Sequence, residues 1–241
     1  MAAPDADSTP SSDAAPLPVP SDGESVASLS AETSARVLKQ VEFYFSVSNL
    51  PRDKFLRAEM EKDASGEGFV DLALLCSFSR MRQVLSLTAP NCAIPTSAVR
   101  AVAAVLRTSK ELVVTPEDDP TPRVRRAAKI EDLKAAESEA DGRSVMAKPF
   151  PFDTTVDALQ TFFADYGNVN AVRMRRHQMS KDFKGSVYVE FDSEATAKAV
   201  LEKASVEPGL IFEGAKLDLE FKLSFLDRVK AERLARAEGA Q

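Results

Sequence analysis

The chain has few of the residues that build common catalytic and metal sites. Its 241 residues include no tryptophan, one histidine and two cysteines. His177 has no second histidine as a partner, and Cys76 and Cys92 do not form a CxxC pair or make a zinc site by themselves. We therefore expect no catalytic residues, no metal site and no cofactor. The thiols are expected to be buried or inert in a reduced, intracellular protein.

Long hydrophobic runs are also missing. Apolar stretches fall far short of the roughly 20 residues that span a bilayer. The N-terminus lacks the basic and apolar regions of a secretory signal. Hydrophobic residues make up 44% and charged residues 28% of the chain, a balance that is ordinary for globular proteins. The length predicts one or two domains.

The acidic charge is concentrated at the N-terminus. The net charge is −6, and residues 1–35 contain six acidic residues with no lysine or arginine. The rest of the chain is therefore close to neutral. A neutral body binds nucleic acid only where its basic groups cluster, so selectivity must come from a shaped site. Residues 1–33, rich in Ala, Ser, Pro and Asp, are predicted to be a disordered acidic tail.

Residues 34–126 are predicted to form a first domain. Apolar residues at helical spacing follow Ser34, and Pro51 is expected to open a second helix. Residues 69–87 are expected to be helical, although strand boundaries there are hard to place, and a helix is predicted from Pro95 through Leu106. Apolar residues at 112–114 and Val124 flank a turn rich in Pro and Asp, which indicates a β-hairpin. Helices followed by a hairpin describe a winged helix.

A second domain is predicted at 143–238, after a helical or flexible linker at 127–142. Its pattern predicts strands at 144–148, 168–175, 184–191 and 216–221, with helices at 155–165 and 193–203. This β-α-β-β-α-β order is that of the ferredoxin-like fold. An amphipathic helix at 223–237 follows. The chain is thus predicted to be an α+β protein: a winged helix, then a ferredoxin-like domain with a C-terminal helix.

The stretch 184–191 (KGSVYVEF) resembles the octamer of the RNA recognition motif. In that fold, outward-facing aromatic residues of the central strands stack on bases. Tyr188 occupies one stacking position, while Ser186 and Met146 stand where aromatic residues are usual. The fold is therefore expected with a depleted RNA platform, and use of this domain for protein contact remains an alternative.

Several basic residues are candidate phosphate contacts, because guanidinium groups pair with phosphate oxygens. One group lies between the second and third strands of the second domain, and its alternative is a solvated surface loop. The second group flanks Asp53, and its alternative is likewise solvation. The candidates are Arg52, Lys54, Arg173, Arg175 and Arg176.

The strongest motif lies in the first domain. The segments 40–45 (QVEFYF) and 48–56 (SNLPRDKFL), followed by 78–81 (FSRM), closely resemble the La motif. The resemblance covers about residues 34–126. Together with the following recognition motif and its late helix, resemblance to the La module extends to about residue 236.

These residue types suit recognition of an RNA end. A glutamine amide can pair with the edge of uracil, and aromatic faces stack on unpaired bases, each worth about 1–3 kcal/mol. A carboxylate accepts hydrogen bonds from the neighbouring 2′-OH and 3′-OH of a terminal ribose. The same carboxylate repels a 3′-phosphate and loses a bond to a deoxyribose end.

The La resemblance implies specific roles for these positions. Gln40 would contact a uracil edge, and Asp53 would hold the terminal hydroxyls. Phe43 replaces a common tyrosine and Ser79 a usual asparagine, and both are expected to affect affinity. The aromatic residues would otherwise be core at these spacings, and Asp53 near a helix start could simply favour the helix dipole. The predicted RNA-binding set is Gln40, Phe43, Tyr44, Asp53, Phe55, Phe78, Ser79, Val172 and Tyr188.

The resemblance implies a nuclear, monomeric RNA-binding protein that is not an enzyme. It would hold U-rich 3′-OH ends of RNA polymerase III transcripts, such as precursor tRNAs, in a cleft between its domains. Occupancy would protect these ends from exonucleases and assist maturation. The alternatives are a La-related protein that stays bound to one non-coding RNA, and a non-catalytic protein-interaction scaffold.

Overall fold

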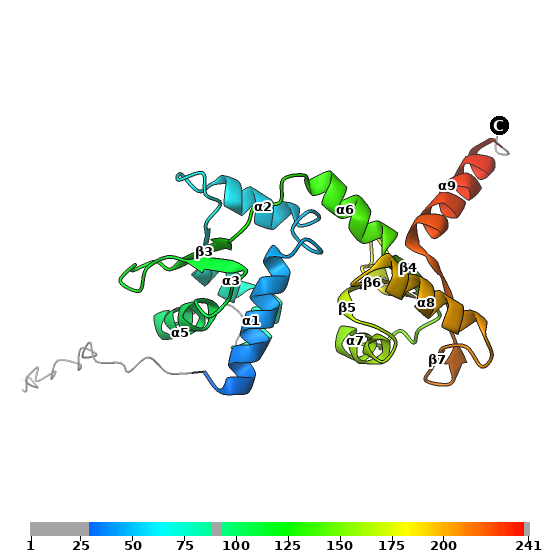
Figure 1. The fold of residues 1–241 in the computed structure, drawn as a ribbon, viewed down its shortest axis with the longest axis horizontal. Helices are drawn as coiled ribbons and strands as arrows, with labels where there is room; N and C mark the ends of the chain where they lie inside the picture. Colours follow the sequence, from blue (N-terminus) through cyan, green and yellow to red (C-terminus); the bar gives the residue numbers. More distant parts are fainter. Residues whose placement is uncertain (1–28, 88–92, 239–241) are drawn as a thin grey trace, which may run out of the picture.

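The computed structural model describes residues 29–87 and 93–238, which form two domains connected by a helix (Figure 1). The first domain contains α1 to α5 and the strands β1 to β3. The second contains β4 to β9 with α7, α8 and α9, and α6 connects them. Most of the predicted acidic tail and Cys92 lie outside the described residues.

Helix α1 (Ala31–Phe45) begins earlier than the sequence pattern predicted. Ser30 is its N-cap, and the Ser30 side chain accepts a hydrogen bond from the Thr33 N–H at 3.2 Å. Val37, Val41 and Phe45 repeat every four residues and are completely buried. One face of α1 therefore belongs to the core.

Helix α2 (Lys54–Glu61) begins three residues after Pro51, so the prediction that Pro51 opens this helix is wrong. The N-cap is Asp53, whose Oδ1 accepts a hydrogen bond from the Leu56 N–H at 2.9 Å. Leu56 is fully buried and fastens α2 to the core. The chain between Ser46 and Arg52 consists of turns.

The segment 69–87 is less uniformly helical than predicted. It begins with the short strand β1 (Val70–Asp71) and continues with α3 (Leu72–Ser77) and α4 (Ser79–Val84). Phe78 interrupts the helices with an extended backbone, φ −62° and ψ 140°. A single helical pattern in the sequence therefore becomes a strand and two short helices.

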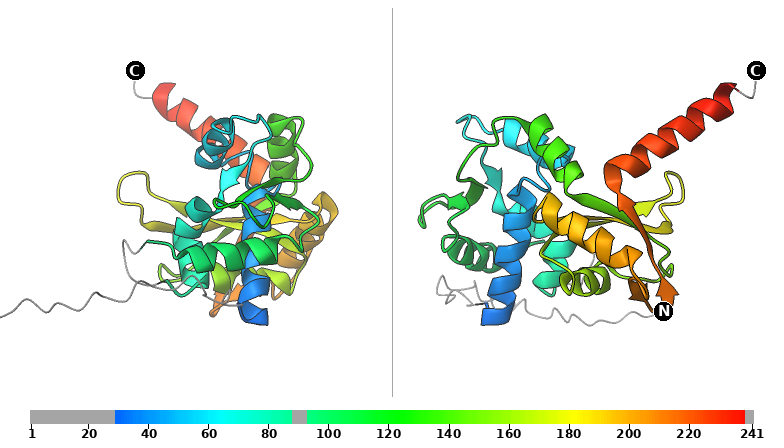
Figure 2. Two further views of the ribbon diagram at one scale, coloured as in Figure 1. Left: turned by 90° about the vertical axis from the view of Figure 1, so that its left-hand side faces the viewer. Right: turned by 45° about the vertical axis from the view of Figure 1, so that its right-hand side comes forward.

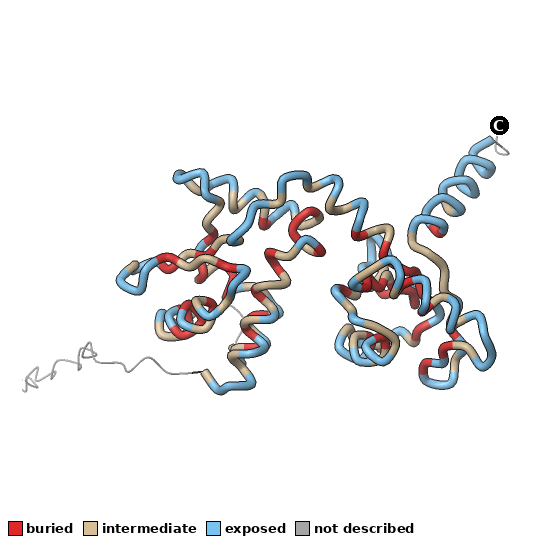
Figure 3. Tube along the Cα trace, viewed as in Figure 1, coloured by how far each residue is buried: buried red, intermediate tan, exposed pale blue. Residues whose placement is uncertain are grey.

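Helix α5 (Thr96–Leu106) and the hairpin of β2 (Leu112–Val114) and β3 (Arg123–Arg126) follow as predicted. Strand β3 pairs with both β1 and β2, giving the antiparallel order β1-β3-β2. The helices enclose one hydrophobic core with this small sheet. Buried residues, red in Figure 3, recur along α1, and the buried residue of β3 is Val124.

The predicted linker contains a helix, α6 (Leu133–Gly142). Asp132 is its N-cap and accepts hydrogen bonds from the N–H groups of Lys134 and Ala135, at 2.8 and 2.9 Å. Ala140 is completely buried where α6 reaches the second domain. This connection is thus folded and packed at its C-terminal end.

The second domain has the predicted ferredoxin-like order. Its elements are β4 (Ser144–Lys148), α7 (Val156–Ala164), β5 (Val169–Arg176), β6 (Phe183–Phe191), α8 (Glu194–Ser205) and β9 (Asp218–Phe221). A hairpin of β7 (Ile211–Phe212) and β8 (Ala215–Lys216) precedes β9. The antiparallel sheet has the order β5-β6-β4-β9, so β5 is an edge strand.

One face of this sheet packs on α7 and α8. Val187, Val189 and Phe191 alternate along β6 and are fully buried in that core. Helix α9 (Lys222–Glu238) begins directly after β9, and both views in Figure 2 show it extending away from the domain. Only its beginning packs on the sheet, through Phe225.

Among the described residues, no helix combines the length and apolarity required to cross a membrane.

Candidate nucleic-acid interface

The first domain brings three predicted aromatic residues together from three elements. Phe78 lies between Tyr44 and Phe55, with ring centroids 5.4 and 5.9 Å away in edge-to-face geometry. Tyr44 is nearly buried, whereas the Phe55 side of the cluster is open, since Phe55 is 53% exposed. The cluster therefore has one end anchored in the core and one end available for stacking on a base.

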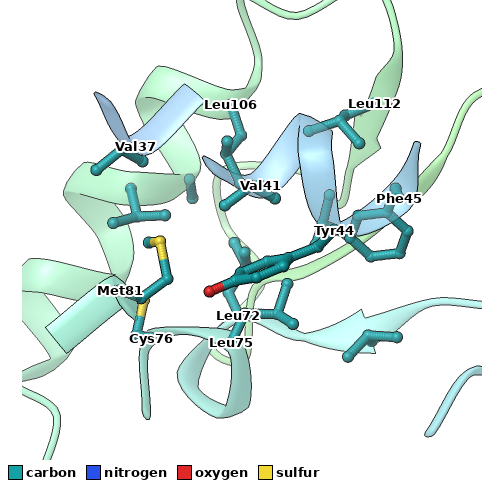
Figure 4. Packing of buried hydrophobic residues seen from close by; sticks show 14 of the residues in the cluster. Val37, Val41, Tyr44, Phe45, Leu72, Leu75, Cys76, Met81, Leu106 and Leu112 are labelled. Carbon is teal, nitrogen blue, oxygen red and sulfur yellow. The ribbon is translucent and has the colours of Figure 1, made fainter. Parts of the chain in front are cut away.

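Tyr44 links this cluster to the hydrophobic core. Figure 4 shows its ring among Val41, Leu72 and Leu75. Burial raises the pKa of Tyr44 to about 12, although a hydrogen bond with the Gln40 side chain and the charge of Arg80 act against this. Gln40, Tyr44 and Arg80 therefore share one neighbourhood, as the first-domain motif predicted for Gln40 and Tyr44.

Asp53 borders the same neighbourhood, and its negative charge also raises the pKa of Tyr44. Asn49 joins the two residues: its Nδ2 donates to the Tyr44 carbonyl at 3.1 Å and to Asp53 Oδ2 at 3.3 Å. Because Oδ1 caps α2, the carboxylate is held in place from both sides. A carboxylate has about four acceptor sites, so acceptor capacity remains for two ribose hydroxyls.

A cleft between the two domains adjoins this cluster. Its volume is about 580 Å³. The first domain contributes Gln40 and Phe43 from α1, and the second contributes Val172 from the edge strand β5. Figure 1 shows β5 and α7 on the side of the second domain that faces α1. Three residues predicted from different domains thus line one cavity, while Ser79 is exposed at the start of α4.

An ion pair between Arg80 of α4 and Asp157 of α7 crosses this cleft. Both side chains are largely exposed, 44% and 63%. Exposed pairs contribute about 0–1 kcal/mol, so this contact does little to hold the domains together. Arg36 and Lys39 also line the cleft and give it a basic side.

Tyr188 is not part of the cleft. It lies on the open face of the sheet, where α9 covers it: the Phe225 ring is 6.1 Å away and the Lys222 ammonium is 5.0 Å from its ring centroid. Met146, predicted at another platform position, is 1% exposed. Tyr188, the only aromatic residue predicted for the sheet platform, is therefore covered by α9.

Two of the candidate phosphate contacts are engaged within the second domain. Arg175 lies over Tyr188 and Phe225, with its guanidinium carbon 5.4 and 4.5 Å from their ring centroids. Arg176 donates to the Lys181 carbonyl at 3.0 Å. Both residues belong to strand β5, which extends one residue beyond the predicted strand at 168–175. Lys54 is exposed at the start of α2.

Two further candidates join the domains instead of facing solvent. Arg173 pairs with the buried Glu190 at 3.2 Å and donates to the Ser48 carbonyl, and burial lowers its pKa. Arg52 forms an ion pair with Asp141 of α6. The guanidinium groups of Arg173 and Arg52 are thus engaged within the protein in this arrangement, and their contact with phosphate stays a prediction.

Comparisons with known proteins agree with both sequence motifs. The model of the La domain matches residues 37–108, and that of the RNA recognition motif matches residues 129–207. La protein 2 of Arabidopsis thaliana is 38% identical over 200 residues, which cover 82% of this chain and 48% of that protein. The chain belongs to the La-motif family of RNA-binding proteins. We refer to its domains as the La motif and the RNA recognition motif.

Other relatives come from two branches of this family. The Lupus La protein homolog of Mus musculus is 30% identical over 202 residues, covering 83% of this chain and 44% of the relative. La-related protein 7 of Mus musculus is 31% identical over 183 residues, covering 73% and 29%. The chain thus spans less than half the length of these relatives.

Sequence reasoning missed the polar contacts between the La motif and the RNA recognition motif. Ser48 Oγ donates to Glu190 Oε1 at 2.6 Å, across 142 positions of sequence. An indication was present, because Glu190 is an acidic residue between Val189 and Phe191 in a strongly apolar strand. Such a residue requires a partner, but the sequence did not identify which one. Within the described residues, no group of three or more potential His, Cys, Asp or Glu ligands gathers around a metal position.

The raised pKa of Tyr44 predicts a stability change at high pH. Since the pKa of Tyr44 is about 12 in the folded protein and 10.0 is the ordinary value for tyrosine, the unfolded chain loses the phenolic proton first. The contribution to stability is complete below pH 10 and is lost as the pH rises towards 12. We expect the free energy of unfolding to decrease more steeply with pH in the wild type than in Tyr44→Phe. Urea unfolding between pH 9 and about 11.5 measures this difference, and parallel curves for both proteins contradict it.

Proposed function

We propose that this protein holds the U-rich 3′-OH ends of RNA polymerase III transcripts, including precursor tRNAs, in the nucleus. Occupancy of the end protects it from exonucleases and assists maturation without any chemical step. The observation that supports this most is the position of Asp53 beside the Tyr44, Phe78 and Phe55 cluster. An acceptor next to stacking faces suits a terminal ribose with two free hydroxyls.

The cleft supports a site of more than one nucleotide. Gln40 contacts Tyr44 and also lines the cleft, so it connects the aromatic cluster with the surface of Val172. The terminal nucleotide is proposed to lie at Asp53 and Phe55. The preceding uridine then lies in the cleft between Gln40 or Phe43 and Val172. Both domains contribute to this arrangement.

The 3′ end of the RNA tests this function directly. We expect a short oligouridine with a 3′-OH to bind at least about tenfold more tightly than the same RNA with a 3′-phosphate, because Asp53 repels the phosphate charge. Fluorescence anisotropy with both RNAs at one fixed salt concentration measures the ratio. A 2′-deoxy terminal nucleotide should give an intermediate affinity. Equal affinity for all three RNAs contradicts the proposed pocket.

A La-related protein dedicated to one non-coding RNA is the second candidate, favoured by the 31% identity to La-related protein 7. The two candidates share the pocket but differ in what precedes the uridines. A panel of U-tailed RNAs with different bodies separates them. Similar affinities across the panel support a general chaperone, whereas one strongly preferred body supports the dedicated protein.

The covered face of the recognition motif favours a third candidate, a protein-interaction scaffold. Its platform residue Tyr188 is packed against Phe225, and Leu223, Leu226 and Leu234 of α9 are exposed. A scaffold needs no free RNA end. It becomes the leading candidate if the wild type binds 3′-OH oligouridine no better than the other RNAs.

A further inference from the structure

Glu190 is a charged residue in a completely buried position of the RNA recognition motif. It lies on β6 with no exposed surface, on the same sheet face as Tyr188. Its carboxylate accepts hydrogen bonds from Arg143 Nη2 at 2.8 Å and Arg173 Nη1 at 3.2 Å. A buried carboxylate is tolerated only where such partners compensate its lost hydration.

The remaining partner comes from the other domain. Ser48 of the La motif is 4% exposed, and its hydroxyl donates to Glu190. The carbonyl of Ser48 accepts a hydrogen bond from Arg173. The hydroxyl and the carbonyl of Ser48 are therefore both bound by the recognition motif, away from water, where a lost partner is costly.

A second set of contacts holds the same La-motif segment. Arg52 forms an ion pair with Asp141, which also pairs with Lys222 at the start of α9. Arg52 also donates to the Glu137 carbonyl at 3.1 Å. We call residues 48–53 the docking segment, because contacts at both ends tie it to α6 and to the recognition motif.

The docking segment is also the segment that carries the proposed ribose contact. It ends at Asp53, and Asn49 within it donates to Asp53 Oδ2. Contacts of the recognition motif with Ser48 and of α6 with Arg52 therefore act on the chain that presents Asp53. The exposed Arg80–Asp157 pair at the cleft contributes little by comparison.

We propose that Glu190 is a positioning residue: through Ser48 and Arg173 it fixes the orientation of the two domains before RNA binds. The cleft is then preformed in the free protein. If only a fraction of the molecules has the domain orientation that binds RNA, the apparent affinity for RNA is the intrinsic affinity multiplied by that fraction. The expected effect on RNA affinity rests on the proposed function, whereas the fixed domain orientation in the free protein is independent of it.

Distances between the domains in the free protein test the proposal. Spin labels are attached to two cysteines introduced at exposed positions, Lys110→Cys in the La motif and Glu202→Cys in the recognition motif. Of the two native cysteines, Cys92 is replaced by serine so that it takes no label, and Cys76 is buried. Double electron–electron resonance measures the distance between the two labels. We expect one narrow distance distribution for the otherwise unchanged protein. Glu190→Gln should broaden it, because the amide nitrogen donates where the arginines need an acceptor.

Two variants complete the design. Ser48→Ala removes the interdomain hydrogen bond from the La side and leaves the charges of the recognition motif intact, so it decides the result if Glu190→Gln does not fold. Glu220→Gln is the control: this residue lies on β9 and pairs at the surface with Arg228. Its distribution should remain narrow. Narrow distributions in both interface variants overturn the proposal.

RNA binding supplies the functional readout. We expect Glu190→Gln to bind 3′-OH oligouridine about tenfold more weakly than the wild type, which corresponds to a competent fraction near one tenth. Saturating RNA should narrow the distance distribution of Glu190→Gln again. A variant whose recognition motif is merely damaged would not show this narrowing. A broad distribution with unchanged affinity overturns the positioning role. If the wild type binds 3′-OH and 3′-phosphate RNA equally well, the proposed function fails. The distance distributions still show whether Glu190 fixes the domain orientation.

Discussion

Asp53→Asn is expected to weaken binding of 3′-OH oligouridine by about 30- to 150-fold, or roughly 2–3 kcal/mol. The substitution replaces one carboxylate oxygen with an amide that donates instead of accepting. One of two hydrogen bonds to the terminal ribose is then lost, and the other no longer involves a charge. Affinity for the 3′-phosphate RNA should fall less, since the repulsion is removed as well.

Asparagine is the informative replacement because Asp53 has two roles. Its Oδ1 caps α2 through the Leu56 N–H, and asparagine is also a good N-cap. Alanine would lose the cap and the ribose contact together. Anisotropy titrations with 3′-OH and 3′-phosphate RNA measure the change in affinity and in discrimination.

The first domain offers a matched control for this variant. Asp71 is likewise an N-cap, and its Oδ1 accepts from the Ala73 N–H at 2.8 Å, but it caps α3. Asp71→Asn should leave RNA affinity unchanged within about twofold. If Asp53→Asn also binds like the wild type, the role of Asp53 is limited to capping.

Phe45→Ala is expected to lower the free energy of unfolding of the La motif by about 3–5 kcal/mol. Phe45 is completely buried at the end of α1, beside the core residues labelled in Figure 4. Its removal leaves a cavity in a domain whose total stability is about 5–15 kcal/mol. Because α1 also carries Gln40 and Tyr44, RNA binding should be lost at temperatures where this domain unfolds.

Urea unfolding followed by hydrogen exchange resolves the two domains separately. The amides of α1 and α5 should lose protection in Phe45→Ala, while those of β6 in the recognition motif keep most of theirs. Phe152→Ala is the control, since Phe152 is 79% exposed and its loss should change stability by less than about 0.5 kcal/mol. A decrease below about 1 kcal/mol for Phe45→Ala contradicts the assigned core role.

Most regular elements followed from local patterns in the sequence. The apolar spacing of α5 and the alternation of β6 each reflect one face of one element, so neighbouring residues carry the information. The La-motif segments at 40–45 and 48–56 likewise predicted Gln40, Tyr44, Asp53 and Phe55 as a group. The structure brings the aromatic members of this group together with Phe78.

Local patterns were less reliable where a second element decided the outcome. Strand β1 forms because Val70 pairs with Val124 of β3, a partner that the helical spacing of residues 69–87 does not reveal. Helix α2 begins at Lys54 after its cap Asp53 and not at Pro51, and the Asn49 side chain links this cap to the end of α1.

The arginines show most clearly what depended on the tertiary structure. By composition, Arg52, Arg173 and Arg175 all suit phosphate binding, and the sequence determined only that these cations exist near the predicted site. Their partners are Asp141 of α6, Glu190 of β6 and the Phe225 ring of α9, which lie at least 17 positions away along the chain. A charged group takes whichever partner folding brings within hydrogen-bond distance and shields from water. The identity of that partner depends on which distant segments of the chain pack together, which no local pattern contains.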